Sequence, residues 1–193
     1  GKNINLVIIG GDVELDKSIL ESLSDPLTHM IRNACDHGIE APNIRKANNK
    51  SENGQIDLRA WHEGGQVHIE VRDDGKGINP GYIKKKVVEK GLRSEQDLVS
   101  LSHKEILNLV LLPGFTTAEQ VSDVSGRGVG MDVVTSNIEK IGGTLDLDSV
   151  TGKGSAVRLQ LPLTLAIIPC LIIRVKEHNY AIPQINLEEL VTL

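Results

Sequence analysis

Aromatic side chains and cysteines are scarce in this 193-residue chain, which holds one Trp, two Tyr, one Phe and two Cys. A core must therefore be built from Leu, Ile and Val, and the stacking platforms that single-stranded nucleic acids require are missing. The two cysteines, Cys35 and Cys170, are too few for a disulfide framework, and they fit a reducing compartment.

A basic field and a membrane-spanning segment are also lacking. The net charge of −5 at pH 7 offers no attraction to a polyanion. The longest apolar run, residues 165–173, is interrupted by Pro169 and is well short of the ~20 residues that a spanning helix needs. We therefore expect no nucleic-acid partner, no direct membrane insertion and a cytoplasmic location. Because the chain begins with Gly1 and shows no signal peptide, we expect a fragment of a longer protein.

Hydrophobic periodicity predicts an α+β protein. Alternating apolar residues predict strands over 3–9, 55–62, 66–72, 144–149 and 155–161. Helices are expected over 16–23, 81–90, 102–111 and 128–141. Asp25 followed by Pro26 is typical of an N-cap and a first helical residue, so a separate helix is expected from there to about Gly38. Residues 112–125 have no regular period and predict a functional lid.

The predicted helix ending at Gly38 carries polar groups on one side. At about 100° per residue, Asn33, Asp36 and His37 fall within one sector around His29, and the apolar residues fall opposite. One interpretation is an ordinary solvated face. The other is a site, since these groups bind metals or hydrogen-bond ligands, and His and Asn are costlier helix formers than Glu or Lys. Spacing alone leaves both open.

A carboxylate followed by two glycines ends the predicted strand 66–72. In VRDDGKGI (71–78), Asp73 can accept a hydrogen bond from an exocyclic amine. Gly75 and Gly77 lack Cβ atoms that would block a flat ring. The alternatives are a plain hairpin turn, which this segment alone leaves open, and a calcium loop, whose alternating acidic ligands and closing glutamate are absent.

A third motif, GRGVGM (126–131), opens a predicted helix. Glycines before a helix N-terminus present N–H donors and the positive end of the helix dipole to phosphate. The alternative is a flexible loop end. The spacing is not that of a dinucleotide-binding G-x-G-x-x-G turn, and no G-x-x-x-x-G-K-[ST] phosphate loop occurs in the chain.

The order of these motifs resembles the GHKL ATPases, which include gyrase B, MutL and sensor histidine kinases. The resemblance implies a two-layer α/β sandwich of the Bergerat type over residues 1–160. It narrows to chemotaxis histidine kinases of the CheA type on RNACDHGIE (32–40), SGRGVGMDVV (125–134) and the F-box-like PGFTT (113–117). Residues 161–193, with LPLTLAI (161–167) and YAIP (180–183), are similar to the start of the CheW-like regulatory domain, a short truncated β segment.

This resemblance implies ATP and Mg²⁺ as cofactors. Asn33 would coordinate the metal, with His37 reaching the metal or the phosphates, and an amide oxygen is a suitable hard ligand. His29 would face the γ-phosphate as a base or a charge stabiliser. Asp73 would bind the adenine amino group. The remaining residues of the implied site lie in or beside the motifs: Asp36, Gly75, Gly77, Ile78, Ser125, Gly126, Arg127, Gly128, Val129, Gly130, Met131 and Ser155.

The implied reaction is transfer of the ATP γ-phosphoryl group to a histidine on a separate phosphotransfer domain, since none of the chain's own histidines lies on an acceptor-type helix. Implied partners are that domain, the coupling protein CheW and chemoreceptors through the full regulatory domain, and response regulators downstream. The implied location is at membrane-associated chemoreceptor arrays.

Two other functions compete with this one. A GHKL clamp ATPase would use a glutamate base on the first helix, but residues 26–38 contain His29 and no glutamate. A nucleotide-dependent interaction module without kinase activity would be expected to carry a degenerate site, whereas all the motifs are intact.

Overall fold

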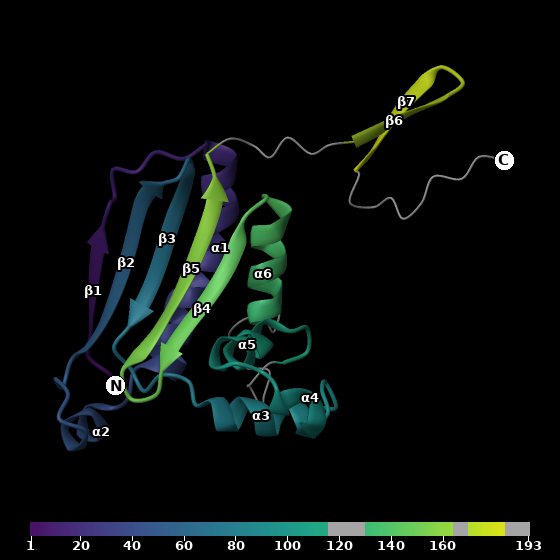
Figure 1. Ribbon diagram of the computed structural model, residues 1–193. Coiled ribbons are helices and arrows are strands. Elements are labelled where there is room, and N and C mark those ends of the chain that lie inside the picture. The colour runs from purple at the N-terminus through teal and green to yellow at the C-terminus, as the bar shows by residue number, and fades with distance from the viewer. Residues whose placement is uncertain (116–129, 164–169, 184–193) are drawn as a thin grey trace.

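The computed structural model describes residues 1–115, 130–163 and 170–183. Its main sheet has five strands in the order β1-β2-β3-β5-β4. The bounds are β1 Ile4–Ile9, β2 Gly54–Glu63, β3 Gln66–Asp73, β4 Thr144–Val150 and β5 Gly154–Pro162. The β1–β2 pair is parallel and the other pairs are antiparallel (Figure 1). All five strands were predicted, within one or two residues at their ends.

Two helices, α1 (Lys17–Asn33) and α6 (Met131–Lys140), cover one face of this sheet (Figure 1). The strand β3 alternates as predicted, with its apolar side chains in the core shared with both helices. The buried residues of this core include Ile19, Leu23, Met30, Val67, Ile69, Val71, Val134, Ile138, Leu159 and Leu161. The fold is therefore the expected two-layer α/β sandwich.

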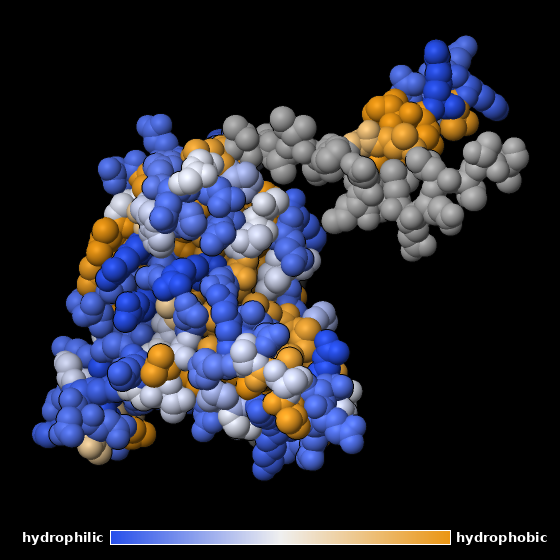
Figure 2. All heavy atoms as spheres, in the orientation of Figure 1, coloured by the Kyte–Doolittle hydropathy of each residue, from blue (hydrophilic) through white to orange (hydrophobic). Residues whose placement is uncertain are grey.

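The opposite face of the sheet is charged. The Arg158 guanidinium donates to Glu70 at 2.6 Å and to Asp148 at 2.7 Å, and Arg59 pairs with Asp57 at 2.8 Å. Hydrophilic side chains cover the sheet face that Figure 2 presents, and an apolar strip runs along the β1 edge. The helix layer thus buries one side of the sheet and leaves ion pairs on the other.

A second core lies beside β4. It is built from α3 (Pro80–Glu89), α4 (Glu95–Val99), α5 (His103–Asn108) and the 3₁₀ helix η2 (Leu109–Leu111). Phe115 is only 2% exposed within it. The predicted lid therefore begins from an anchored residue, while its residues 116–125 lie outside the described part of the chain. The helix α4 was not predicted, although Ser94 and Asp97 form a capping box that signals its start.

One local prediction was wrong, and two short elements were missed. The expected helix start at Pro26 does not exist, because α1 runs unbroken through Pro26 and its N-cap is Asp16, which accepts from the Ser18 N–H at 2.8 Å. Ile19, Leu23, Pro26 and Met30 form one buried stripe, so packing outweighs the backbone hydrogen bond that proline lacks. A π-helix, η1 (Ala34–Gly38), and a short helix, α2 (Pro42–Ala47), were also missed.

The strands β6 (Cys170–Val175) and β7 (His178–Pro183) pair antiparallel as a separate two-stranded sheet. These strands agree with the β segment expected within residues 161–193, but the proposed division of the chain after residue 160 stays a prediction. No helix in the described ranges is both long and apolar enough to cross a membrane.

Candidate nucleotide-binding site

The end of α1 and the π-helix η1 supply the first group of predicted site residues. His29 and Asn33 are half-buried, whereas Asp36 and His37 are exposed. The wide turn is closed by the Ile39 N–H, which donates to the Ala34 carbonyl five residues earlier at 2.8 Å. A rotation of 100° per residue therefore fails after Asn33, and the helical-wheel positions predicted for Asp36 and His37 do not hold.

Asn33 joins the first motif to the third. Its amide nitrogen donates to the Met131 sulfur at 3.4 Å, across the contact between α1 and α6. Gly130 is the N-cap of α6, so the positive end of that helix lies next to Asn33. Five other residues of the predicted phosphate-binding segment, Ser125, Gly126, Arg127, Gly128 and Val129, lie outside the described residues.

His29 lies in an environment that favours its neutral form. Partial burial, reinforced by the nearby Arg32 and His37 side chains, lowers the pKa of His29, and the Asp132 carboxylate opposes this only weakly. A neutral imidazole at pH 7 can accept a proton or a hydrogen bond. The geometry is thus compatible with a base, one of the two roles left open by the sequence.

Asp73 ends β3 in a buried position, with only 7% of its surface exposed. It lies between Ile56 of β2 and Ser155 of β5, and its Oδ1 accepts from the Gly75 N–H at 2.8 Å. Burial raises the pKa of Asp73, although the Gly75 and Ser155 N–H groups oppose the shift. A buried acceptor of this kind is suited to a donor on a flat apolar ligand.

Two glycines of the loop after β3 permit contacts that a side chain would block. A Cβ at Gly75 would overlap the Gly38 carbonyl, and a Cβ at Gly77, which has a φ of +66°, would overlap the Val150 carbonyl. Gly38 accepts from the Lys76 N–H at 3.0 Å. The loop is therefore packed directly against the end of η1, which brings the first and second motifs together.

The β4–β5 hairpin supports the other half of the loop. The Ile78 N–H donates to the Ser149 hydroxyl at 2.8 Å, and Thr151 donates to the Ile78 carbonyl at 3.1 Å. Ser155, predicted as a ligand contact, lies 2.9 Å from the Ser149 hydroxyl. The contacts of Ser149 and Thr151 with Ile78 were not predicted, because these residues are far from Ile78 in the sequence and meet it only in the folded structure.

A third supporting group was also missed. Glu40, Arg45 and Lys50, from the segment between η1 and β2, form a buried ionic cluster with Asp74. Glu40 is the last residue of the RNACDHGIE motif (32–40). The other two are indistinguishable in sequence from surface charges.

The described residues hold no side-chain metal cluster of their own. They contain no group of three or more His, Cys, Asp or Glu side chains that could hold an ion. Asn33 presents its nitrogen to Met131, which leaves the amide oxygen as the atom for a hard cation. This fits a Mg²⁺ ion that takes most of its ligands from phosphates and water and only one or two from the protein.

The fold is that of a histidine-kinase-type catalytic domain. The nucleotide-free catalytic domain of histidine kinase ThkA matches with a TM-score of 0.50 at 20% identity, over 84% of this chain and 80% of that one. The sequence model of the family described as "Histidine kinase-, DNA gyrase B-, and HSP90-like ATPase" matches residues 22–165, and the chain belongs to this family.

Proteins of similar sequence show which members of this family the chain resembles. The chain is 51% identical over all 193 residues to the sensor histidine kinase CheAY of Helicobacter pylori, and covers 24% of it. It is 47% identical over 182 residues to the chemotaxis protein CheA of Bacillus subtilis, covering 94% of this chain and 27% of that protein. The resemblance to chemotaxis kinases is confirmed, and the chain spans about a quarter of the length of these relatives.

Proposed function

We propose that this chain is the ATP-binding catalytic domain of a chemotaxis histidine kinase, and that it donates the γ-phosphoryl group of ATP to a histidine on a separate phosphotransfer domain. The observation that carries the proposal is the meeting of three elements at one end of the sheet. The α1 end contacts the α6 N-terminus through Asn33, and Gly38 contacts the loop after Asp73. The identity to CheA proteins extends over nearly the whole chain.

Each element has a distinct task in this proposal. The Asp73 carboxylate accepts the amino group of adenine, and the loop of Gly75 and Gly77 lies beneath the base. The α6 N-terminus, with Gly130 and Met131 and the preceding glycines, receives the phosphates. Ile78 and Ser155 lie at the edge of the base site.

The phosphate end is the site of the chemistry. Bound Mg²⁺ would neutralise the phosphate charge, and Asn33 would hold it, with Asp36 and His37 beside it. His29, kept neutral by its surroundings, would orient or deprotonate the incoming imidazole. Because phosphoryl transfer depends chiefly on positioning and charge stabilisation, these residues need only hold donor and acceptor in line.

The partners belong to the longer protein that this chain would come from. We propose that they are the phosphotransfer domain, CheW and chemoreceptors through a regulatory domain that begins after residue 160, and response regulators downstream. The location would be cytoplasmic, at receptor arrays.

Calorimetric titration with ATP in the presence of Mg²⁺ tests the binding half of the proposal. We expect saturable heat with ATP and with ADP. An absence of binding at millimolar nucleotide would refute the assignment.

Supplying a phosphotransfer domain with labelled ATP tests the catalytic half. Label should appear on the acceptor histidine faster than free phosphate is released. Release of phosphate without labelled acceptor would favour the clamp ATPase instead.

A further inference from the structure

A buried ionic cluster lies behind the loop that carries Asp73. The side chain of Arg45 is 1% exposed, that of Glu40 is 6% exposed, and that of Lys50 is 17% exposed. Asp74, directly after Asp73, completes the cluster at 43% exposure. The segment before β2 therefore supplies Glu40, Arg45 and Lys50, and the loop after β3 supplies Asp74, so that two cations and two anions meet.

Arg45, on α2, ties the loop to the start of β2. Its Nη2 donates to the Asp74 carboxylate at 2.7 Å and to the Asn53 carbonyl at 3.3 Å. Its Nε donates to the Ser51 carbonyl at 2.6 Å, and its Nη1 donates to Glu40 at 3.2 Å. The rigid guanidinium therefore fixes α2, the segment before β2 and the loop relative to one another.

Lys50 holds the backbone of the loop itself. Its ammonium donates to the Asp74 carbonyl at 3.0 Å, the Gly75 carbonyl at 2.7 Å and Glu40 at 2.9 Å. Gly75 is the residue whose N–H binds the Asp73 carboxylate at 2.8 Å. The chain of contacts from Lys50 through Gly75 to Asp73 is continuous.

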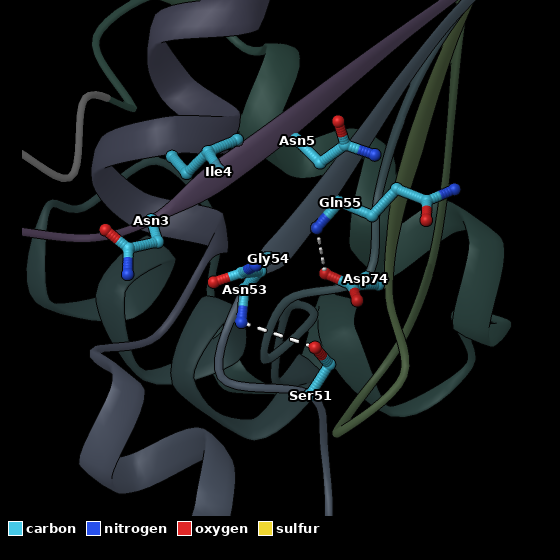
Figure 3. A pocket seen from close by; sticks show the side chains of 8 residues that line it. All are labelled: Asn3, Ile4, Asn5, Ser51, Asn53, Gly54, Gln55 and Asp74. Atoms are coloured by element: carbon cyan, nitrogen blue, oxygen red, sulfur yellow. Dashed lines mark hydrogen bonds between the residues drawn. The ribbon is translucent and has the colours of Figure 1, made fainter.

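The two adjacent aspartates have separate tasks. Asp74 accepts from the Gln55 N–H through Oδ1 at 2.9 Å and from Arg45 through Oδ2 at 2.7 Å. Figure 3 shows the hydrogen bond between Gln55 and Asp74 beside a polar cavity of about 430 Å³ that Asp74 lines together with Asn3, Asn5 and Asn53. Both carboxylate oxygens of Asp74 are therefore used in contacts within the protein, whereas Asp73 faces the proposed base site.

Glu40 keeps its negative charge at neutral pH. Burial opposes the charge of Glu40, but the hydrogen bond from Lys50 and the positive charges of Lys50 and Arg45 outweigh it and lower the pKa of Glu40. Buried ion pairs of this kind add little net stability compared with apolar packing. Their value lies in geometry, because each partner has one position in which all its hydrogen bonds are made.

We propose that Arg45 and Lys50 are positioning residues that set the adenine selectivity of Asp73. The inference rests on the proposed function. The carboxylate accepts from the 6-amino group of adenine but repels the 6-oxo group of guanine, so selectivity depends on where its free oxygen lies. A site must be held within about 0.5 Å to discriminate in this way. The cluster sets that position through Gly75.

The test is the ratio of ATP to GTP affinity in the full 193-residue chain, measured by calorimetry with Mg²⁺. Lys50→Met removes the two carbonyl contacts. Affinity for ATP should fall about tenfold, as expected when one charge-assisted hydrogen bond to the base is misplaced, and GTP affinity should stay within about twofold. Lys46→Met is the matched control, since the Lys46 side chain is 77% exposed and its ammonium pairs with Glu52 on the surface; it should leave both affinities unchanged.

Glu40→Gln provides a second, isosteric variant that keeps the volume and removes the charge holding both cations. It should lower the same ratio, and the double variant should lose less than the product of the single losses because both act through Gly75. A thermal melt of each variant measures stability separately.

The outcomes distinguish this inference from the proposed function. A wild-type chain that binds neither nucleotide would overturn the proposed function and this inference with it, whereas a wild-type chain that binds ATP and GTP equally would overturn this inference. A selective wild-type chain whose Lys50→Met and Glu40→Gln variants keep the wild-type ratio would overturn the positioning role alone. That result includes variants that are less stable, or weaker for ATP and GTP in equal measure.

Discussion

Replacing Asp73 by Asn should weaken ATP binding without destabilising the free protein. In the proposed complex the carboxylate accepts a hydrogen bond from adenine, and loss of a charged partner costs about 1.5–3 kcal/mol. This corresponds to a fall in affinity of roughly 10- to 150-fold. The upper part of that range is expected, because the Gly75 N–H should retain the amide oxygen and turn the amide nitrogen, a donor, toward the donor on the base.

Stability should change in the opposite direction. The folded pKa of Asp73 is raised by burial, so between the unfolded value of 3.8 and the folded value the native state binds more protons than the unfolded state. The contribution of Asp73 to stability is therefore present at low pH and is lost as pH rises through the folded pKa. Above the folded pKa the native state bears a buried charge that asparagine removes. The variant should melt at the same or a higher temperature than the wild type, and any gain should vanish in acid.

Calorimetry and thermal melts at several pH values, on the chain without ligand and with ATP, check both parts. Asp57→Asn is a matched control, since Asp57 is 8% exposed, nearly the same as Asp73, but lies on the charged face of the sheet paired with Arg59. It should not alter ATP affinity. Wild-type affinity in the Asp73→Asn chain, or a much lower melting temperature at pH 7, would refute the reasoning.

Two further predictions concern the phosphate end and the second core. His29→Gln should reduce transfer to a supplied phosphotransfer domain by a larger factor than it reduces ATP affinity; equal losses, measured by labelled transfer and calorimetry, would limit His29 to binding. Phe115→Ala should destabilise the chain by about 3–5 kcal/mol, the usual cost of emptying a buried aromatic site, and Phe115→Leu by much less. Urea unfolding compares the two, and similar small effects would show that Phe115 does not anchor the first part of the predicted lid.

Much of the architecture could be predicted from local patterns. The alternation of Val67, Ile69 and Val71 marks β3 and its buried face, and the structure confirms it. The order of motifs predicted that Asn33, Asp73 and the helix after Gly130 belong to one site. Their pairwise contacts agree with this, although the chemical role of each side chain stays a prediction.

The failures share a physical cause. Pro26 is an ordinary helix-start signal, but it fills a place in the buried stripe of α1, and only the tertiary packing shows that the helix continues through it. The π-helix has no sequence period of its own, so the positions of Asp36 and His37 were misjudged. In the sequence, Arg45 and Lys50 resemble solvated surface charges, and only the folded structure shows that they bind the loop after Asp73. Long-range contacts, rather than residue type, decide all three.

The residues that hydrogen-bond the loop after Asp73 indicate that the base end and the phosphate end of the site have different roles. Lys50 binds the carbonyls of residues 74 and 75, Gly38 and Gly152 bind the N–H and carbonyl of Lys76, and the β4–β5 hairpin binds both polar groups of Ile78. A loop held at so many of its backbone groups is ordered during folding, so little conformational entropy remains to be lost when the base binds. The base end therefore supplies affinity and selectivity from a fixed frame. The phosphate end, with His29 and Asn33, is left to respond to the metal and the acceptor, and substitutions at the two ends should separate as changes in binding and changes in transfer.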